Sequence, residues 1–407
     1  MLIRRTILSL VILVYLVTSS IPVALAGPQI VGQAAVLIDS KSGKIVYAKN
    51  ENTPMAPAST TKILTAILAL EKCKPTDSVS AGKNATVVEP SAIGLKEGET
   101  ITMENLLYSL MLKSANDAAI AIAEHVSGSV REFSALMNRK IREWGATNSN
   151  FINPNGLPDP NHYTTAHDLA IIAKHAMENQ EFRNIVATKV KTIPRTDDTA
   201  IKWLQNHNKL LWRYDGANGI KTGYTKEAKQ CLVASADRGG QEFIAVILSS
   251  EGTNVWSDAE TLLNYGFTAF STYKQKNANT LVRTVKVKKG TRDLALVTDK
   301  DFYYTLPKGQ NRAVSEVVEI NSEIKAPITK GQLLGKVKFV QQGEALGAVN
   351  LVAQNDVPAK RITIKGKTFP TTSILAAVLV LVSFIAWKGR KRKRRKSRLW
   401  INRNAIR

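Results

Sequence analysis

The order of strand-like and helix-like segments between residues 34 and 270 leaves few possible folds. Two strand-like runs, 34–38 and 44–47, flank Ser42-Gly43 as in a β-hairpin, and two more follow late in the chain, at 231–234 and 243–248. The segments between them have helical periodicity and cover residues 60–72, 103–126, 131–144 and 165–178. Strands at both ends with helices between predict an α+β domain, in which early and late strands close one antiparallel sheet beside a helical lobe.

A different pattern begins after residue 270. Short alternating runs broken by Gly, Pro and Asn are typical of strands in a small all-β domain, and they lie at 284–288, 314–320, 334–340 and 347–353. Because this region has no cluster of His, Cys or paired acids, we interpret it as a spacer or interaction module. The predicted boundaries are 27–270 for the first domain and 271–368 for the all-β domain.

The first 26 residues have the pattern of a cleaved export signal. Arg4 and Arg5 precede an apolar stretch, and Ala24-Leu25-Ala26 forms an A-x-A cleavage site ahead of Gly27. An uncleaved signal anchor is the alternative, because apolar residues continue almost to Ala26. Both interpretations place the body of the protein outside the cytoplasm.

Residues 371–387 form an uncharged run that is apolar on every side, which predicts a transmembrane helix rather than an interfacial one. The run is at the short end for a bilayer. Residues 388–407 hold eleven Lys or Arg and no acid, so the positive-inside rule predicts a cytoplasmic tail next to anionic membrane lipids. The predicted location is therefore the cell membrane, with a single span and the body on the extracytoplasmic side.

The composition excludes several classes of protein. Hydrophobic residues make up 44% and charged residues 22%, as in globular rather than disordered chains. The net charge of +23 suggests nucleic-acid binding, but the excess is concentrated in the C-terminal tail, so no nucleic-acid partner is predicted. Cys73 and Cys231 are too few for a disulfide framework or a four-thiolate zinc site, and we expect two buried free thiols.

A serine and a lysine three residues apart, Ser59 and Lys62, open a helix that is almost wholly apolar. Residues at this spacing share a helix face, so the Lys62 amine can reach the Ser59 hydroxyl. Burial and the positive end of the helix dipole both lower the pKa of an amine, and a neutral amine beside a serine is a general base beside a nucleophile. The alternative is a helix cap followed by an incidental lysine.

Two further polar motifs follow in the chain. Ser114-Ala115-Asn116 lies between two apolar helical stretches, where a loop can point short polar groups into a cleft; taken alone, it also fits a turn or cap. Lys221-Thr222-Gly223 precedes the strand-like run at 231–234 and occurs once. As a purely structural motif, it would be an edge strand with an exposed lysine and a glycine turn.

Together and in this order, S-x-x-K, S-x-N and K-T-G are the motif set of penicillin-binding proteins and serine β-lactamases. The chain resembles the low-molecular-mass, serine-type D-Ala-D-Ala carboxypeptidases over residues 33–365. The similarity extends to segments at 57–62, 109–117, 153–157, 162–168 and 221–225. The resemblance implies a serine β-lactamase/transpeptidase-like catalytic domain followed by the family's C-terminal all-β domain.

The resemblance also implies roles for individual residues. Ser59 would attack the carbonyl between the two terminal D-alanines of a peptidoglycan stem peptide, with Lys62 as proton acceptor. Ser114 and Lys221 would relay a proton to the leaving D-alanine, and Asn116 would hold the acyl chain's amide. The implied substrate-binding residues are Lys221, Thr222 and Gly223 with Tyr224, whose backbone N–H would join that of Ser59 in the oxyanion hole. Penicillin and other β-lactams would acylate Ser59 and leave slowly.

One position departs from the family pattern. Many relatives have an arginine on the strand after K-T-G that helps to bind the substrate carboxylate, and our matching places Glu242 there. An acid at that position would weaken anion binding, so cleavage of cross-links by a DD-endopeptidase activity is one alternative function. A wall-binding relative that has lost turnover is the other. The class A β-lactamase segment Glu-x-x-Leu-Asn is absent from the sequence between the second and third motifs, which argues against fast drug hydrolysis.

The remaining polar residues predict no further chemistry. The five histidines form no H-E-x-x-H motif, and we interpret His162 and His167 as structural. Thr165-Ala-His-Asp168 fits a helix capping box. No metal and no cofactor are predicted, and the sequence gives no indication of the oligomeric state.

Overall fold

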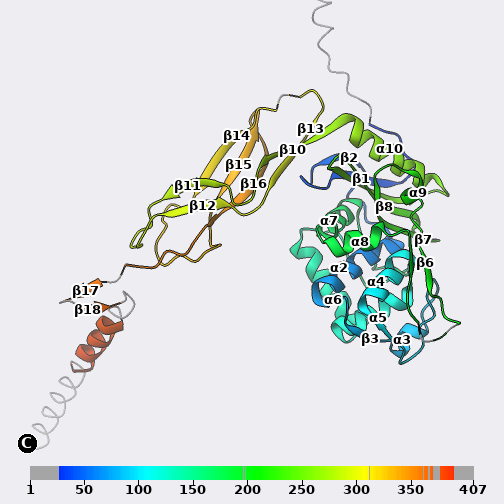
Figure 1. Ribbon diagram of the computed structural model, residues 1–407, viewed down its shortest axis with the longest axis horizontal. Coiled ribbons are helices and arrows are strands. Elements are labelled where there is room, and N and C mark those ends of the chain that lie inside the picture. Colours follow the sequence, from blue (N-terminus) through cyan, green and yellow to red (C-terminus); the bar gives the residue numbers. More distant parts are fainter. Residues whose placement is uncertain are drawn as a thin grey trace, which may run out of the picture. The chain divides into compact units, whose positions relative to one another are not determined.

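The computed structural model describes residues 27–388 except 196, 198, 311, 361, 365–366 and 370–375. The predicted export signal at 1–26 and the basic tail from residue 389 onward lie outside the described residues. The chain divides into two compact units (Figure 1), one running to Thr272 and including Thr305–Lys308, the other comprising Tyr273–Tyr304 and the chain from Gly309. Each unit is described separately below.

The first unit is built on a five-stranded antiparallel sheet with the strand order β2-β1-β9-β8-β7. Its strands are β1 (Ala34–Asp39), β2 (Ile45–Lys49), β7 (Ala217–Thr225), β8 (Lys229–Arg238) and β9 (Gln241–Ser250). Ala34 pairs with Leu248 in β9, so the first strand joins one of the last. The prediction of a sheet closed by early and late strands is confirmed.

Helices cover both faces of this sheet, which is why its central strands are apolar on both sides. Helix α10 (Asn254–Ala269) packs on β8 and β9, while α7 (Ala166–Met177) and α8 (Gln180–Ala187) pack on the opposite face. Successive residues of β1 accordingly belong to two different buried clusters, with Val36 on one face and Leu37 on the other. The last strand, β7, forms the edge of the sheet.

The helical lobe lies between β2 and β7 in the sequence (Figure 1). Its main helices are α2 (Lys62–Lys72), α4 (Met103–Leu112), α5 (Asn116–Ser127) and α6 (Val130–Glu143). The short elements around them are η1 (Ala58–Thr61), α3 (Lys83–Thr86), α9 (Leu210–Arg213), β3 (Ser78–Ser80), β4 (Thr100–Thr102), β5 (Val190–Thr192) and β6 (Trp203–Gln205). Helix α2 is buried from Lys62 through Ala69, as its almost wholly apolar sequence predicts.

Polar caps and glycine define where the lobe helices begin and end. Thr102 caps α4 and Ser129 caps α6 through their side-chain oxygens. Helix α5 ends at Gly128, whose φ of 80° is left-handed. At α7, Thr165 Oγ1 accepts from the Asp168 N–H at 3.0 Å. The predicted capping box is thus half formed, because Asp168 Oδ2 accepts from Asn148 N–H instead.

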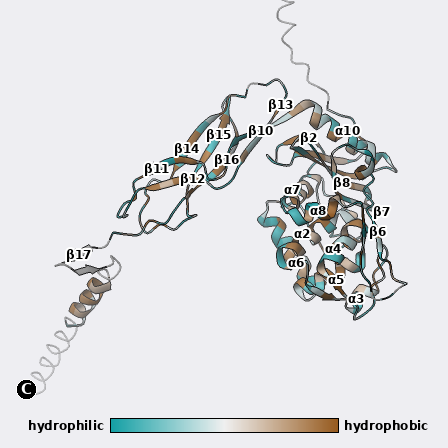
Figure 2. Cartoon of the chain, in the orientation of Figure 1, coloured by the Kyte–Doolittle hydropathy of each residue, from teal (hydrophilic) through white to brown (hydrophobic). Residues whose placement is uncertain are grey.

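The second unit is an all-β domain. Its five-stranded antiparallel sheet has the order β11-β12-β16-β15-β14, with strands β11 (Leu281–Val285), β12 (Leu294–Thr298), β14 (Ser315–Ile320), β15 (Leu333–Gln341) and β16 (Glu344–Ala353). These strands carry both hydrophobic and hydrophilic residues (Figure 2), and in β15 the buried Val337 and Phe339 alternate with Lys336 and Lys338. The remaining strands are β10 (Phe270–Lys276), β13 (Phe302–Pro307), β17 (Ile362–Ile364) and β18 (Lys367–Phe369).

The prediction of a transmembrane helix at 371–387 is wrong for this structure. Within the described part of the chain, no helix has the length and apolar character needed to cross a membrane. The described residues of this region form a helix over 376–388.

Candidate active site

Ser59 and Lys62 lie at the junction of η1 and α2, beneath the edge strand of the sheet. Ser59 lies in the short 3-10 helix η1, and α2 begins at Lys62. Lys62 Nζ donates a hydrogen bond to Ser59 Oγ at 2.9 Å. The three-residue spacing therefore brings the amine to the hydroxyl, as predicted.

Lys62 is completely buried. Its Nζ also donates to Asn116 Oδ1 at 2.7 Å and to the Asn155 carbonyl oxygen at 2.6 Å. Burial is the main cause that lowers the pKa of Lys62 well below its usual value, and the nearby charge of Lys221 lowers it further. The buried carboxylate of Asp117 acts in the opposite direction. The two oxygen acceptors position the amine, while burial and the charge of Lys221 favour its neutral form.

The Ser114–Asn116 motif occupies the connection between α4 and α5. Ser114 has a φ of 62°, and Asn116 is the first residue of α5. The Asn116 amide is fixed from both ends, since Nδ2 donates to the Glu89 carbonyl at 2.8 Å and Oδ1 accepts from Lys62. Ser114 and Asn116 are both buried. The motif thus lies in a turn between two helices, as the structural alternative expected, but its polar side chains are buried and Asn116 contacts Lys62.

Lys221, Thr222 and Gly223 lie on β7, the sheet edge next to Ser59. A Cβ atom on Gly223 would lie 3.0 Å from the Ser59 backbone nitrogen and 3.1 Å from the Pro57 carbonyl oxygen. Glycine thus permits the strand to approach the nucleophile's backbone closely. Tyr224 follows with 61% of its surface exposed, at the mouth of the site.

The side chain of Lys221 is buried rather than exposed, contrary to the edge-strand alternative. Desolvation lowers the pKa of Lys221 to about 7. Its Nζ donates to the Thr222 carbonyl at 3.0 Å. Among the described residues, no hydrogen bond joins Lys221 to Ser114, so the implied proton relay is not directly connected in this state.

The loop at 153–157 contributes to the site through its backbone, which the sequence motifs alone could not reveal. The Asn155 carbonyl accepts from Lys62, and the Pro154 carbonyl accepts from Thr65 Oγ1 at 2.6 Å. Gly156 has a φ of 85°, and a Cβ there would lie 1.9 Å from the Ala58 carbonyl oxygen. The N-P-N-G sequence, with its turn-forming residues, was the available indication.

Two buried side chains behind the site, His162 and Asp117, also support its structure, and the sequence did not predict this. His162 Nδ1 accepts from the Ile152 N–H at 3.1 Å, so its Nε2–H donates to Thr61 Oγ1 at 2.9 Å. Burial lowers the pKa of His162 to about 4, which fits its predicted structural role. Asp117, directly after Asn116, accepts from the N–H groups of Ile93 and Leu95, and burial raises the pKa of its carboxyl.

A second neutral histidine lies close to the lysines of the site. Burial lowers the pKa of His207 to about 4, and the charges of Lys221 and Lys113 act in the same direction. His207 lines a pocket with Trp212 and Arg213 beside α9. Its sequence context gave no sign of this placement, because α9 and β7 come together only in the fold.

The interpretation of Glu242 as a residue near the substrate carboxylate is wrong. Lys221 stands opposite Val233, and Val233 opposite Val246, which places Glu242 four residues, or about 13 Å, away along β9. Its carboxylate is held by both terminal nitrogens of Arg183, each at 2.7 Å. Matching by sequence alone misplaced the acid by four residues along β9.

Glu251 is an acidic residue at the opposite end of β9 from Glu242. It follows β9 directly and pairs with Lys229 at the start of β8. The two cysteines are both free, as predicted, but only Cys231 is buried, whereas Cys73 is partly exposed.

This site can carry out acyl transfer. A serine hydroxyl lies within hydrogen-bond distance of a buried amine that favours the neutral form, and a second buried lysine and the backbone of an edge strand lie beside it. Nucleophile, base and backbone donors are the components that acyl-enzyme chemistry requires. The fold and site thus define a serine acyl-transfer enzyme that uses a lysine base.

Comparisons with known proteins agree with this class. A family model described as D-alanyl-D-alanine carboxypeptidase matches residues 21–252, and one described as the penicillin-binding protein 5 C-terminal domain matches residues 270–359. The D-alanyl-D-alanine carboxypeptidase DacF of Bacillus subtilis is 36% identical over 333 residues, which are 80% of this chain and 85% of the relative. DacA of Haemophilus influenzae is 33% identical over 347 residues, covering 81% and 86%.

Solved structures give the same result. Penicillin binding protein 5 from Haemophilus influenzae has a TM-score of 0.69 at 32% identity and covers 82% of this chain and 100% of its own. DacD from Francisella tularensis has a TM-score of 0.61 at 28% identity, covering 84% and 97%. The chain belongs to the D-alanyl-D-alanine carboxypeptidase family, and the resemblance based on its three motifs is confirmed.

Proposed function

We propose that this protein is a serine-type D-Ala-D-Ala carboxypeptidase that removes the terminal D-alanine from peptidoglycan stem pentapeptides through an acyl-Ser59 intermediate. The observation that carries the proposal is the hydrogen bond from buried Lys62 Nζ to Ser59 Oγ at 2.9 Å. Family membership supports the substrate class, since the curated relatives bear the name D-alanyl-D-alanine carboxypeptidase. The protein acts in cell-wall biogenesis and maturation.

In the acylation step, neutral Lys62 accepts the proton of the Ser59 hydroxyl as Oγ attacks the carbonyl between the two D-alanines. The lowered pKa of Lys62 supports this role, because an amine that is already charged accepts no proton. The backbone N–H groups of Ser59 and Tyr224 receive the negative charge that develops on the carbonyl oxygen. The close approach of Gly223 to the Ser59 nitrogen supports this pairing.

The leaving D-alanine takes a proton as its C–N bond breaks. Ser114 and Lys221 supply that proton, and Thr222 with Lys221 binds the terminal carboxylate of the substrate. Asn116 holds the amide of the acyl chain while also orienting Lys62 through its Oδ1. Water then hydrolyses the ester, with Lys62 again taking a proton. A β-lactam, which mimics the dipeptide, acylates the same Ser59 and is released slowly.

The two alternative functions lose support. The endopeptidase alternative depended on Glu242 opposing the substrate carboxylate, and Glu242 is instead engaged by Arg183 at the other end of β9. An inactive wall-binding relative would have lost the nucleophile, the base or their contact. Ser59 and Lys62 are present and in hydrogen-bond contact.

The test is D-alanine release from a stem pentapeptide ending in D-Ala-D-Ala, with the Ser59→Ala variant as the matched control and a fluorescent penicillin in parallel. We expect release and labelling by the wild type, and neither by the variant. Labelling without release would show working acylation and would refute the pentapeptide as substrate. Neither signal, from a folded sample, would refute the enzyme.

We also propose that the protein acts outside the cytoplasm, because residues 1–26 have the pattern of an export signal. Contact of the basic segment 388–407 with anionic lipids remains a prediction from its charge. Protease added to intact spheroplasts should degrade the catalytic unit. Full protection of that unit, with degradation only after lysis, would refute the extracytoplasmic location.

A further inference from the structure

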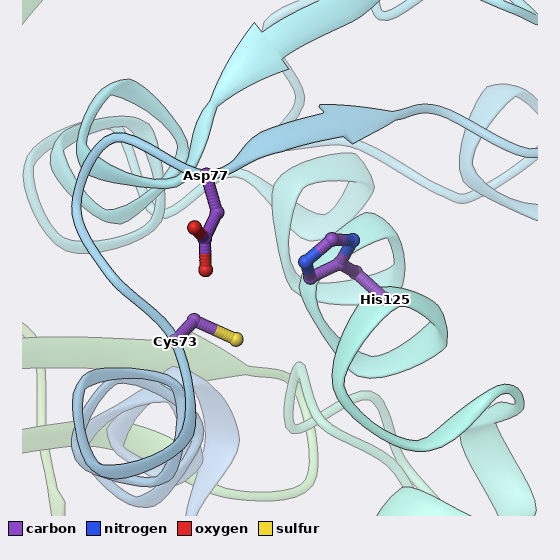
Figure 3. A group of neighbouring side chains, drawn as sticks. All are labelled: Cys73, Asp77 and His125. Atoms are coloured by element: carbon purple, nitrogen blue, oxygen red, sulfur yellow. The ribbon is translucent and has the colours of Figure 1, made fainter.

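Three metal-binding side chains from three different segments converge away from the Ser59 site (Figure 3). Cys73 is the C-cap of α2, Asp77 lies just before β3, and His125 is in the last turn of α5. Their sulfur, carboxylate oxygen and imidazole nitrogen all lie within 4.8 Å of one another. Neither the motifs nor the proposed reaction uses any of these residues.

Each of the three side chains has a donor atom that is available to bind a metal ion. Asp77 uses Oδ2 to accept the Lys74 N–H at 2.8 Å, which leaves Oδ1 for a metal. Among the described residues, neither the Cys73 sulfur nor the His125 ring takes part in a hydrogen bond. The Cys73 and Asp77 side chains are partly buried, and His125 is at the surface, so an ion can enter from solvent.

The donor set favours zinc. Sulfur, imidazole and carboxylate ligands together suit the borderline Zn²⁺ ion, whereas Ca²⁺ and Mg²⁺ take oxygen ligands. Zinc–ligand distances of about 2.0–2.3 Å in a tetrahedron place neighbouring donor atoms about 3.3–3.7 Å apart. Because the donor atoms lie within 4.8 Å of one another, no separation needs to contract by more than about 1.5 Å, and rotation of the exposed His125 side chain can supply this.

The position of the cluster connects it to the two helices that carry the candidate catalytic residues. Helix α2 begins at Lys62 and helix α5 begins at Asn116, and these residues are joined by the 2.7 Å hydrogen bond. The same two helices end beside Cys73 and His125. An ion between Cys73 and His125 links the far ends of both helices.

We propose that Cys73, Asp77 and His125 form a Zn²⁺ site with three protein ligands and water in the fourth position. The site is structural: it ties the C-terminal end of α2 to that of α5 and takes no part in the attack by Ser59. Its occupancy stabilises the helical lobe. The proposal does not depend on which peptide the enzyme cleaves.

The first experiment titrates the full-length reduced protein with Co²⁺ as a spectroscopic substitute for zinc, then displaces it with Zn²⁺. We expect one equivalent of Co²⁺, a thiolate-to-cobalt charge-transfer band, and d–d absorption of tetrahedral intensity. Zinc should also raise the melting temperature by about 5–10 °C at a hundredfold excess over its Kd. Absence of a thiolate band and of any zinc-dependent shift would overturn the proposal.

Variants locate the site. Cys73→Ser should abolish the thiolate band, and His125→Gln should weaken zinc binding by at least about a hundredfold. Cys231→Ser and His175→Gln are the matched controls, one for each residue type, and should bind like the wild type. His125→Gln alters an exposed side chain, so it tests the site even if Asp77→Asn fails to fold. Wild-type binding by Cys73→Ser, or loss of the band only in Cys231→Ser, would overturn the assignment.

Discussion

Gly156 fixes the loop that holds Lys62, and its replacement by alanine tests how the site is assembled. An alanine Cβ would lie 1.9 Å from the Ala58 carbonyl oxygen and 2.9 Å from Thr61 Oγ1. The loop would therefore have to move by more than 1 Å away from η1, and the hydrogen bond from Lys62 Nζ to the Asn155 carbonyl at 2.6 Å would be lost.

The expected size of the effect has two parts. An L-residue at a φ of 85° costs about 1–2 kcal/mol of folding free energy. Loss of the hydrogen bond leaves the neutral Lys62 amine or the Asn155 carbonyl without its buried partner, which costs about 1–3 kcal/mol more. If the second part is expressed in acylation, the rate of Ser59 labelling falls by about 5- to 150-fold.

The measurements are urea denaturation for the free energy of unfolding and the labelling rate with a fluorescent penicillin for acylation. Gly128→Ala is the matched control, because Gly128 has a similar φ of 80° and no atom within 4 Å of its would-be Cβ. It should show only the backbone cost and label normally. Equal stability loss in the two variants together with wild-type labelling by Gly156→Ala would refute the proposed role of the loop.

Three further predictions concern charge. Glu242→Gln should reduce the free energy of unfolding by about 1–3 kcal/mol, because it breaks the ion pair with partly exposed Arg183. The same variant should leave KM for the pentapeptide unchanged. A raised KM with unchanged stability would contradict the placement of Glu242 away from the substrate. The pKa of Lys221 near 7 predicts that kcat/KM declines as the pH rises above 7, because the positive charge that binds the substrate carboxylate is lost. Lys221→Arg should abolish that decline. If the variant keeps the wild-type decline at alkaline pH, Lys221 is not the group responsible. The pKa of His162 near 4 lies below its unfolded value of about 6.5, so unfolding takes up a proton and stability falls by about 3 kcal/mol as the pH drops from 6.5 to 4. His162→Gln should flatten that dependence in denaturation experiments at several pH values, leaving a residual slope from His207; a full wild-type slope would disprove the assignment.

The parts of this protein that could be predicted from its sequence are those that depend on spacing within one element. Ser59 and Lys62 meet because three residues along a helical turn bring side chains together. The alternation of apolar and polar residues along short runs indicated the all-β unit, because that pattern also lies within single strands. The family resemblance then predicted that the three motifs lie around one site.

Other features depend on contacts that no local pattern encodes. The Asn155 oxygen that holds Lys62 belongs to the backbone, so the identity of its side chain does not reveal it. Glu242 was misplaced because register along β9 decides which residue faces the site, and a sequence match does not fix register. The apolar run at 371–387 has the composition of a membrane span, but no helix in the described part of the chain has the length and apolar character needed to cross a membrane.

The pairing of β1 with β9 also bears on how the protein is made. Ala34 finds its partner Leu248 only after the whole helical lobe has been synthesised, so the central strand pair is a contact of very large sequence separation and is expected to form late. Lys221 reaches Ser59 only when β7 joins the same sheet. A nascent or truncated chain therefore carries the serine and its lysine without the cleft around them. Penicillin labelling of this protein consequently reports completed folding as well as the presence of a nucleophile.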